Sequence, residues 1–178
     1  MTNKILFIPL LTLFLFACET TLRPGQIFPP DPLPVATGFS AIEIKQFIDA
    51  LPQDAVSDSA IHVVDVTGDY RVGLYGVYRP QALPSESNLH QVNTTEIYYM
   101  LEGHGTLVTG GEMINGVRAS PTSITIKGTG IKGGVSRNFG PGDVIIIPGY
   151  TPHWWSELDA DLSYIIFRMD PDNRIELH

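Results

Sequence analysis

From residue 61 onward, hydrophobic and polar residues alternate with a period of two, and glycine and proline interrupt the pattern. The segments with this period are 61–66, 70–78, 96–102, 106–109, 122–126, 144–147 and 163–169. Successive side chains of a strand point to opposite faces, so this period predicts strands that each bury one face. Many short strands with glycine-rich turns between them predict an all-β sandwich or barrel.

A helical period precedes the strands. Ser40 and Glu43 have the spacing of a capping box, and Pro52 ends the segment. The apolar positions between them fall on one helical face: Ile44, Phe47, Ile48 and Leu51. The pattern predicts a short N-terminal helix that packs on the β domain.

The N-terminus is apolar over residues 5–16, directly after Lys4. This run is too short to cross the roughly 30 Å hydrocarbon layer as a helix, and it suits a secretory signal. It ends in Leu-Phe-Ala-Cys at residues 15–18, which resembles the lipobox of bacterial lipoproteins. The resemblance implies cleavage before Cys18 and lipid on its thiol and amine; an ordinary secreted protein cut nearby is the alternative. Because Glu19 is not the Asp that often retains lipoproteins in an inner membrane, we expect the outer membrane of a Gram-negative host, facing the periplasm.

Composition narrows the chemistry that the rest of the chain can perform. If Cys18, the only cysteine, carries lipid, then thiolate nucleophiles, disulfides and cysteine-ligated zinc are excluded. The 19 acidic residues against 11 basic ones give a net charge of −8, which argues against nucleic acid as a partner. Residues 19–38 are rich in proline and predict an extended tether, with an ordered arm as the alternative.

We therefore expect one folded domain. The expected segments are a signal peptide (1–17), a lipid-anchored tether (18–39), a helical extension (40–60), the β domain (61–170) and a C-terminal tail (171–178).

Two segments carry the candidate chemistry. The first spans residues 90–103 and contains His90, Glu96 and Gly103. The second spans residues 142–153 and contains, in order, Gly142, Asp143, Pro148 and His153. Together they resemble the two motifs of the cupin superfamily, in its single-domain type 2 form, over residues 61–169. The resemblance implies a double-stranded β-helix (jelly-roll) barrel that binds a metal through His90, Glu96 and His153.

The residues support this interpretation independently. Glu96 shares a strand face with Tyr98 and Met100, and a carboxylate on an inward face is costly unless it is paired or bound to metal. Two histidines and one carboxylate can hold Zn, Mn, Fe or Ni and leave positions open for water or substrate. Val92 stands where the family has a second histidine, so a metal-free pocket with the same groups hydrogen-bonded is the alternative.

We expect Tyr98 to act as a catalytic acid or base and Val92, Met100 and Trp155 to line a substrate pocket; packing is the alternative for Tyr98 and Trp155. Residues 104–141 exceed the length of a minimal cupin and predict an added hairpin or a lid. Cupins include lyases, isomerases, oxygenases and binding proteins, so the fold does not fix the function. We expect a metal-dependent enzyme that acts on a small polar organic molecule in the cell envelope. The alternative is a non-catalytic binding module displayed on the membrane. The sequence does not determine the oligomeric state, and a homodimer is one alternative.

Overall fold

One helix and thirteen strands make up the computed structural model, which describes residues 35–66, 68–83, 85–118 and 120–175. The signal peptide, Cys18 and most of the tether lie outside the described residues. In the described part, no helix combines the length and the apolar character needed to cross a membrane. Residues Ala36–His178 form one compact unit, and the following account concerns that unit.

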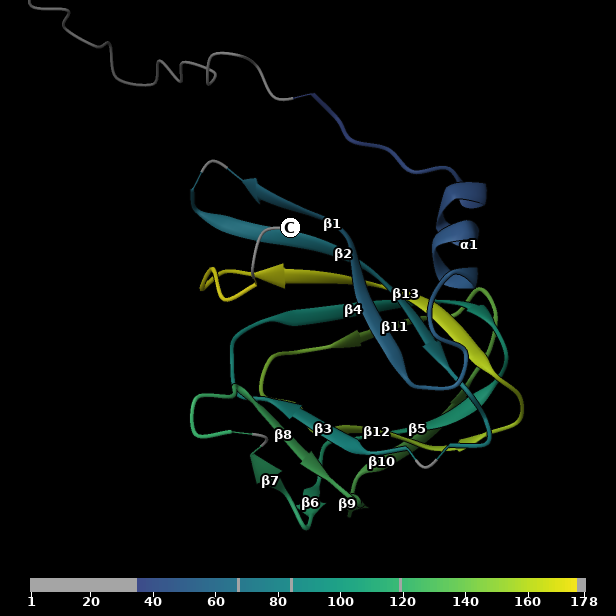
Figure 1. Cartoon of the computed structure of the whole chain (residues 1–178). Helices are drawn as coiled ribbons and strands as arrows, with labels where there is room; N and C mark the ends of the chain where they lie inside the picture. Colours follow the sequence, from purple (N-terminus) through teal and green to yellow (C-terminus); the bar gives the residue numbers. More distant parts are fainter. Residues whose placement is uncertain (1–34, 67, 84, 119, 176–178) are drawn as a thin grey trace, which may run out of the picture. The chain divides into compact units, whose positions relative to one another are not determined.

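The strands form two main antiparallel sheets, which Figure 1 shows as an upper and a lower layer. The upper sheet has the order β1 (Ser57–Val66), β2 (Tyr70–Arg79), β13 (Leu162–Asp170), β4 (Thr95–Glu102) and β11 (Val144–Ile147). The lower sheet has the order β10 (Val135–Phe139), β5 (Gly105–Thr109), β12 (His153–Leu158), β3 (Ser87–His90), β8 (Thr125–Gly128) and β7 (Val117–Arg118). A small third sheet pairs β6 (Glu112–Ile114) with β9 (Gly130–Lys132).

The chain passes from one sheet to the other as it enters each of β3, β4 and β5, and again at β11, β12 and β13. Upper strands β2, β13, β4 and β11 thereby face lower strands β3, β12, β5 and β10. This arrangement is a jelly roll, the double-stranded β-helix. The predicted all-β class and cupin-type barrel are therefore confirmed.

The core lies between the two sheets and comes from the inward-facing positions of their strands. In β4 the burial alternates, with Glu96, Tyr98 and Met100 buried and Tyr99 exposed. The largest fully buried apolar side chains are Trp155, Tyr164, Met100, Leu107, Leu162, Ile166 and Val77. Each such side chain contributes roughly 1.5 to 3 kcal/mol through burial.

The predicted helix is confirmed as α1 (Ala41–Asp49), and both hydrogen bonds of the capping box between Ser40 and Glu43 are present. Ile48 packs with Leu51 against Ile165 on the outer face of the upper sheet. The contact is close enough that a Cβ on Gly76 of β2 would lie 2.9 Å from the ring of Phe47.

Several elements differ from the expected ones. Strand β1 begins at Ser57, inside the segment assigned to the helical extension, and β8 lies a few residues beyond the expected 122–126. Strands β3 and β10 were not predicted, because their sequences SNLH and VSRNF have no apolar alternation. Residues 104–141 do add strands to the barrel, as expected for a hairpin. One of these strands, β8, pairs with β3 over four residues and forms part of the lower sheet.

Candidate metal centre

The three candidate ligands lie where the two sheets face each other. His90 ends β3 and His153 begins β12, which are neighbours in the lower sheet, and Glu96 is the second residue of β4 in the upper sheet. His90 Nε2 lies 3.8 Å from Glu96 Oε1, and His153 Nε2 lies 3.7 Å from Glu96 Oε2. All three ligand atoms fall within 4.8 Å of one another. The sequence prediction that these residues meet is confirmed.

The far nitrogen of each histidine is already engaged. His90 Nδ1 lies 3.0 Å from Thr125 Oγ1, a contact that follows from the pairing of His90 with Thr125 across β3 and β8. His153 Nδ1 lies 3.0 Å from the backbone oxygen of Thr151, which can only accept, so this nitrogen carries the proton. The Nε2 lone pair of His153 is therefore free to point toward Glu96. A partner of this kind behind a histidine is usual at metal sites.

Burial determines the charge of both histidines. It lowers the pKa of His90 and of His153, and the nearby carboxylate of Glu96 opposes this effect only in part. Both imidazoles are consequently neutral at pH 7, which is the form that binds a metal ion.

Glu96 is the most enclosed charge of the site, with a side chain only 3% exposed. Burial alone would raise its pKa, but the charge of Arg168, and that of the two histidines once acid protonates them, outweighs this and holds the pKa at about 2. Arg168 Nε donates to Glu96 Oε1 at 2.8 Å, because Arg168 is the partner of Glu96 in the register of β13 and β4. Glu96 is therefore ionised at any physiological pH.

Arg168 is itself held in place from three sides. Its terminal nitrogens donate to both carboxylate oxygens of Asp58 on β1, at 3.1 and 2.6 Å. Its guanidinium lies 4.1 Å from the centre of the Tyr75 ring, within the range of a cation–π contact. Arg168 thus joins Glu96 to Asp58 across the upper sheet.

Tyr98 stands two residues after Glu96 on the same strand face and donates to Glu96 Oε2 at 3.1 Å. Burial, followed by the charge of Glu96, raises its pKa well above the ordinary tyrosine value. Tyr98 therefore keeps its proton at neutral pH, as an acid would. Its ring stacks on Tyr164 with centroids 4.8 Å apart.

The donor set fits a divalent metal ion. Ligand atoms about 2.0 to 2.2 Å from an ion lie roughly 3 to 4 Å from one another, which matches the two distances to Glu96. Neutral imidazoles and an ionised carboxylate are the protonation states that metal binding requires. The group of His90, Glu96 and His153 could therefore bind a metal ion.

The histidines open onto a cavity of about 330 Å³. This volume is at the lower end of the roughly 300 to 1,000 Å³ of small-molecule sites. Its polar and charged walls include Tyr98, Tyr164, Thr125, Asn88, Arg79, Arg168, Lys127, Asp58 and Glu86. Strand β8 contributes a wall of this cavity through Thr125 and Lys127, which corrects the expectation of a lid over it.

Two of the three residues expected to line the substrate pocket lie in the core, and the third borders the centre. Met100 and Trp155 belong to the core between the sheets and line neither this cavity nor the hollow that Val92 borders. Both side chains face inward, but at their position the interior of the barrel is filled by other side chains. Val92 lines a second hollow, together with His90 and Glu96.

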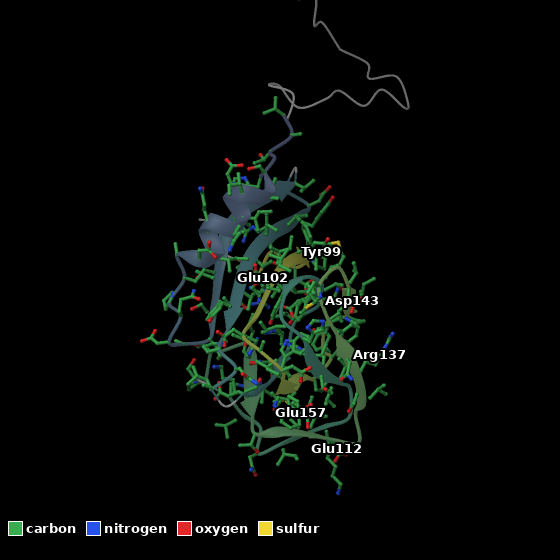
Figure 2. All side chains as sticks on the ribbon, turned by 90° about the vertical axis from the view of Figure 1, so that its right-hand side faces the viewer. Tyr99, Glu102, Glu112, Arg137, Asp143 and Glu157 are labelled. Atoms are coloured by element: carbon green, nitrogen blue, oxygen red, sulfur yellow. The ribbon has the colours of Figure 1, made fainter. Side chains whose placement is uncertain are left out.

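Sequence reasoning missed Arg168, Asp58 and Arg79. A signal for Arg168 was present, because it is the one charged residue before Asp170 in the strand Leu162–Asp170 and shares the face of Tyr164 and Ile166. No comparable signal marked Asp58 or Arg79, which lie near strand ends among other polar residues. Four acidic side chains lie on the surface, along the side of the domain that Figure 2 shows: Glu102, Glu112, Asp143 and Glu157.

No protein-family model matches the sequence, and no curated protein matches it. Solved structures with a similar fold do exist. The neighbours are cupin-family proteins. They include an RmlC-like cupin family protein from Methanocaldococcus jannaschii, with 12% identity over 68% of this chain and 87% of that chain and a TM-score of 0.39.

Two further neighbours have names that state more. DMSP lyase DddQ from Ruegeria pomeroyi is 20% identical over 69% of this chain, with a TM-score of 0.44. The match covers 50% of that protein, so this chain spans about half of its length. KdgF from Halomonas sp. is 18% identical over 67% of this chain and 81% of that chain, with a TM-score of 0.41. At these identities the likeness concerns the fold, and no activity or substrate is carried over.

Proposed function

We propose that this protein is a metal-binding cupin-type enzyme that converts a small polar organic molecule, by a lyase, isomerase or oxygenase type of reaction. The observation that carries the proposal is the convergence of His90, Glu96 and His153, with both histidines in the wall of a cavity whose volume suits a small ligand. Two neutral imidazoles and one carboxylate leave further coordination positions open, as catalytic metal sites do.

A bound divalent ion would polarise a substrate oxygen or lower the pKa of a bound water. The protein's own residues do the rest. Arg168 keeps Glu96 ionised and oriented, and Thr125 and Thr151 orient the two imidazoles. Tyr98 holds a proton in the cavity and can deliver it to a substrate atom that gains negative charge.

The test is a metal titration of demetallated protein with Zn, Mn, Fe(II) and Ni. His90→Ala, Glu96→Ala and His153→Ala should each weaken metal binding at least 100-fold, because two remaining ligands hold a divalent ion poorly against water. His104→Ala is the matched control, since His104 is exposed and lies outside the site. If the three variants bind metal as tightly as wild type and control, the proposed centre is wrong.

Val92→His makes the opposite change. Val92 is 5% exposed and borders the same hollow as His90 and Glu96, so a histidine there would add the missing fourth ligand. We expect tighter metal binding and slower turnover, since the new ligand occupies a position that substrate needs. Metal binding no tighter than in wild type would place residue 92 out of reach of the ion.

A second function has one observation in its favour. Arg168 and Glu96 form a buried ion pair that already balances the carboxylate without a metal. A metal-free site of this kind would serve a binding module that captures a polar ligand without converting it. In the same titration, the binding module predicts no measurable metal affinity in wild type and unchanged ligand binding in the presence of EDTA.

We also propose that the protein is a lipoprotein of the cell envelope, anchored through Cys18, with the outer membrane facing the periplasm as its place in a Gram-negative host. The support is the apolar segment 5–16 and its junction with the only cysteine. Wild type should take up labelled palmitate and fractionate with membranes, and Cys18→Ser should take up none. Soluble wild type without label would contradict the anchor.

A further inference from the structure

Arg79, at the end of β2, lines the same cavity as two of the candidate metal ligands, His90 and His153. Its Nε donates to the hydroxyl oxygen of Tyr164 at 2.9 Å. Its two terminal nitrogens have no hydrogen-bond partner, and no carboxylate pairs with it, among residues 35–66, 68–83, 85–118 and 120–175. A guanidinium with a free edge toward a cavity can receive a ligand.

The other cations of the cavity are already committed. Arg168 binds Glu96 and Asp58, and Lys127 Nζ lies 2.7 Å from Glu86 Oε2. Within the part of the chain that the structure describes, Arg79 is therefore the cation of this cavity that lacks an acidic partner. The two acids in the walls, Asp58 and Glu86, are each taken by a cation.

A short aromatic path joins Arg79 to the candidate metal centre. Tyr164, which receives the Arg79 hydrogen bond, stacks on Tyr98, and Tyr98 donates to Glu96. Because Arg79, His90 and His153 line one cavity, one small molecule can contact Arg79 at one end and the two histidines at the other. The hydroxyl of Tyr164 accepts from Arg79, so its own proton is free for a ligand oxygen.

We propose that Arg79 binds the carboxylate of a small organic acid and so orients it with its second polar group at His90, Glu96 and His153. This inference deepens the proposed function and rests on it. The free edge of a guanidinium matches the two oxygens of a carboxylate, and the Tyr164 hydroxyl adds a third donor. A phosphate dianion fits less well, because Arg79, the one uncommitted cation among the described residues of the cavity, balances a single negative charge.

The experiment measures binding of a panel of monocarboxylates with two to five carbons, lactate among them, each paired with its neutral amide. Ligand-observed NMR titrations on demetallated and zinc-loaded protein give the ratio of the two dissociation constants. The variants are Arg79→Met, which keeps the length of the side chain, and Arg79→Lys, which keeps the charge. Arg137→Met is the matched control, because Arg137 is exposed on β10, on the side shown in Figure 2.

Wild type should bind at least one carboxylate tenfold or more tightly than its amide. Arg79→Met should lose about 10- to 100-fold in carboxylate affinity, the range for a charged hydrogen bond, and keep its amide affinity. Arg79→Lys should lie between them, and Arg137→Met should match wild type. Circular dichroism spectra identical to wild type establish that each variant is folded.

Three results would overturn the inference. They are no preference for any carboxylate in wild type, a preference that survives Arg79→Met, or inorganic phosphate binding more tightly than every carboxylate. The metal titration separates this inference from the proposed function. Metal binding without a carboxylate preference would refute only the role of Arg79. An Arg79-dependent carboxylate preference without metal binding would refute only the metal centre and support the assignment of Arg79.

Discussion

Replacement of Glu96 with Gln should destabilise the protein at neutral pH, and the loss should shrink as the pH falls. Glutamine keeps the size and the hydrogen-bonding oxygen of the side chain but removes its charge. In the folded protein that charge is buried and paired with Arg168 at 2.8 Å. The substitution therefore isolates the electrostatic part of the contact.

The pKa of Glu96 gives the magnitude and the sign. Folding lowers this pKa from 4.5 to about 2, and each unit corresponds to about 1.4 kcal/mol. Glu96 thus contributes at most about 3 kcal/mol to folding at pH 7, because the histidines that add to the shift are uncharged at that pH and because Arg168 keeps Asp58 as a partner in the Gln variant. Because the folded pKa is the lower one, this contribution is complete above pH 4.5 and is lost as the pH falls toward 2. At pH 3 about half of it should remain.

The assay is urea unfolding of wild type and Glu96→Gln at pH 7, 5, 4 and 3, in EDTA so that metal binding does not contribute. We expect a gap in the free energy of unfolding of about 2 to 3 kcal/mol at pH 7 that halves by pH 3. Glu96 raises the pKa of both site histidines in wild type alone, so their contributions do not cancel; the same comparison in a His90→Ala/His153→Ala background removes them. Glu157→Gln is the control, because Glu157 is exposed at the end of β12, and it should change stability by less than about 0.5 kcal/mol.

A gap of equal size at pH 7 and pH 3 would refute the reasoning, since it would show that packing or hydrogen bonding carries the loss. Absence of any gap at pH 7 would show that the Arg168 pair does not stabilise the fold. Either result would also weaken the argument that Glu96 is ionised in the site.

Two further predictions concern the turn after β4 and the support of a metal ligand. Gly103 has φ +78°, and a Cβ there would overlap the backbone carbonyl of Asp161, so Gly103→Ala should lower the free energy of unfolding by more than about 2 kcal/mol. Gly110→Ala is the control, because Gly110 has a similar φ of +72° but open space around it, and it should lose only about 1 kcal/mol. Equal losses in thermal melts would contradict the overlap. Thr125→Val removes the partner of His90 Nδ1 and should weaken metal affinity about 10- to 100-fold with little change in melting temperature. Unchanged affinity in a metal titration would show that Thr125 does not orient the imidazole.

The alternation of residues and the spacing of motifs were sufficient to predict the all-β class, the capped helix, most of the long strands and the three residues that meet at the centre. These features are local. The period of a strand depends only on its own residues. The motifs that contain His90, Glu96 and His153 are short segments beside strands that the alternation predicts.

The same reasoning failed where depth within the barrel mattered. Met100 and Trp155 face inward, as the alternation predicts, but an inward side chain can lie in the packed core or at the cavity, and a period of two does not distinguish these positions. Strand β8 was expected in a lid or hairpin, and only its pairing with β3 makes it a wall of the site.

The charges around the centre depend on the tertiary structure alone. Arg168 reaches Glu96 because β13 pairs with β4 in one register, and a shift by a single residue would turn Arg168 to the opposite face. Arg79 lies near these groups because β2 flanks β13 on its other side. The sequence by itself determines which side chains a strand offers to the interior. Which of them become partners is decided by pairing between segments 70 or more residues apart in the chain, because the energy of a buried charge depends on the groups that surround it in space.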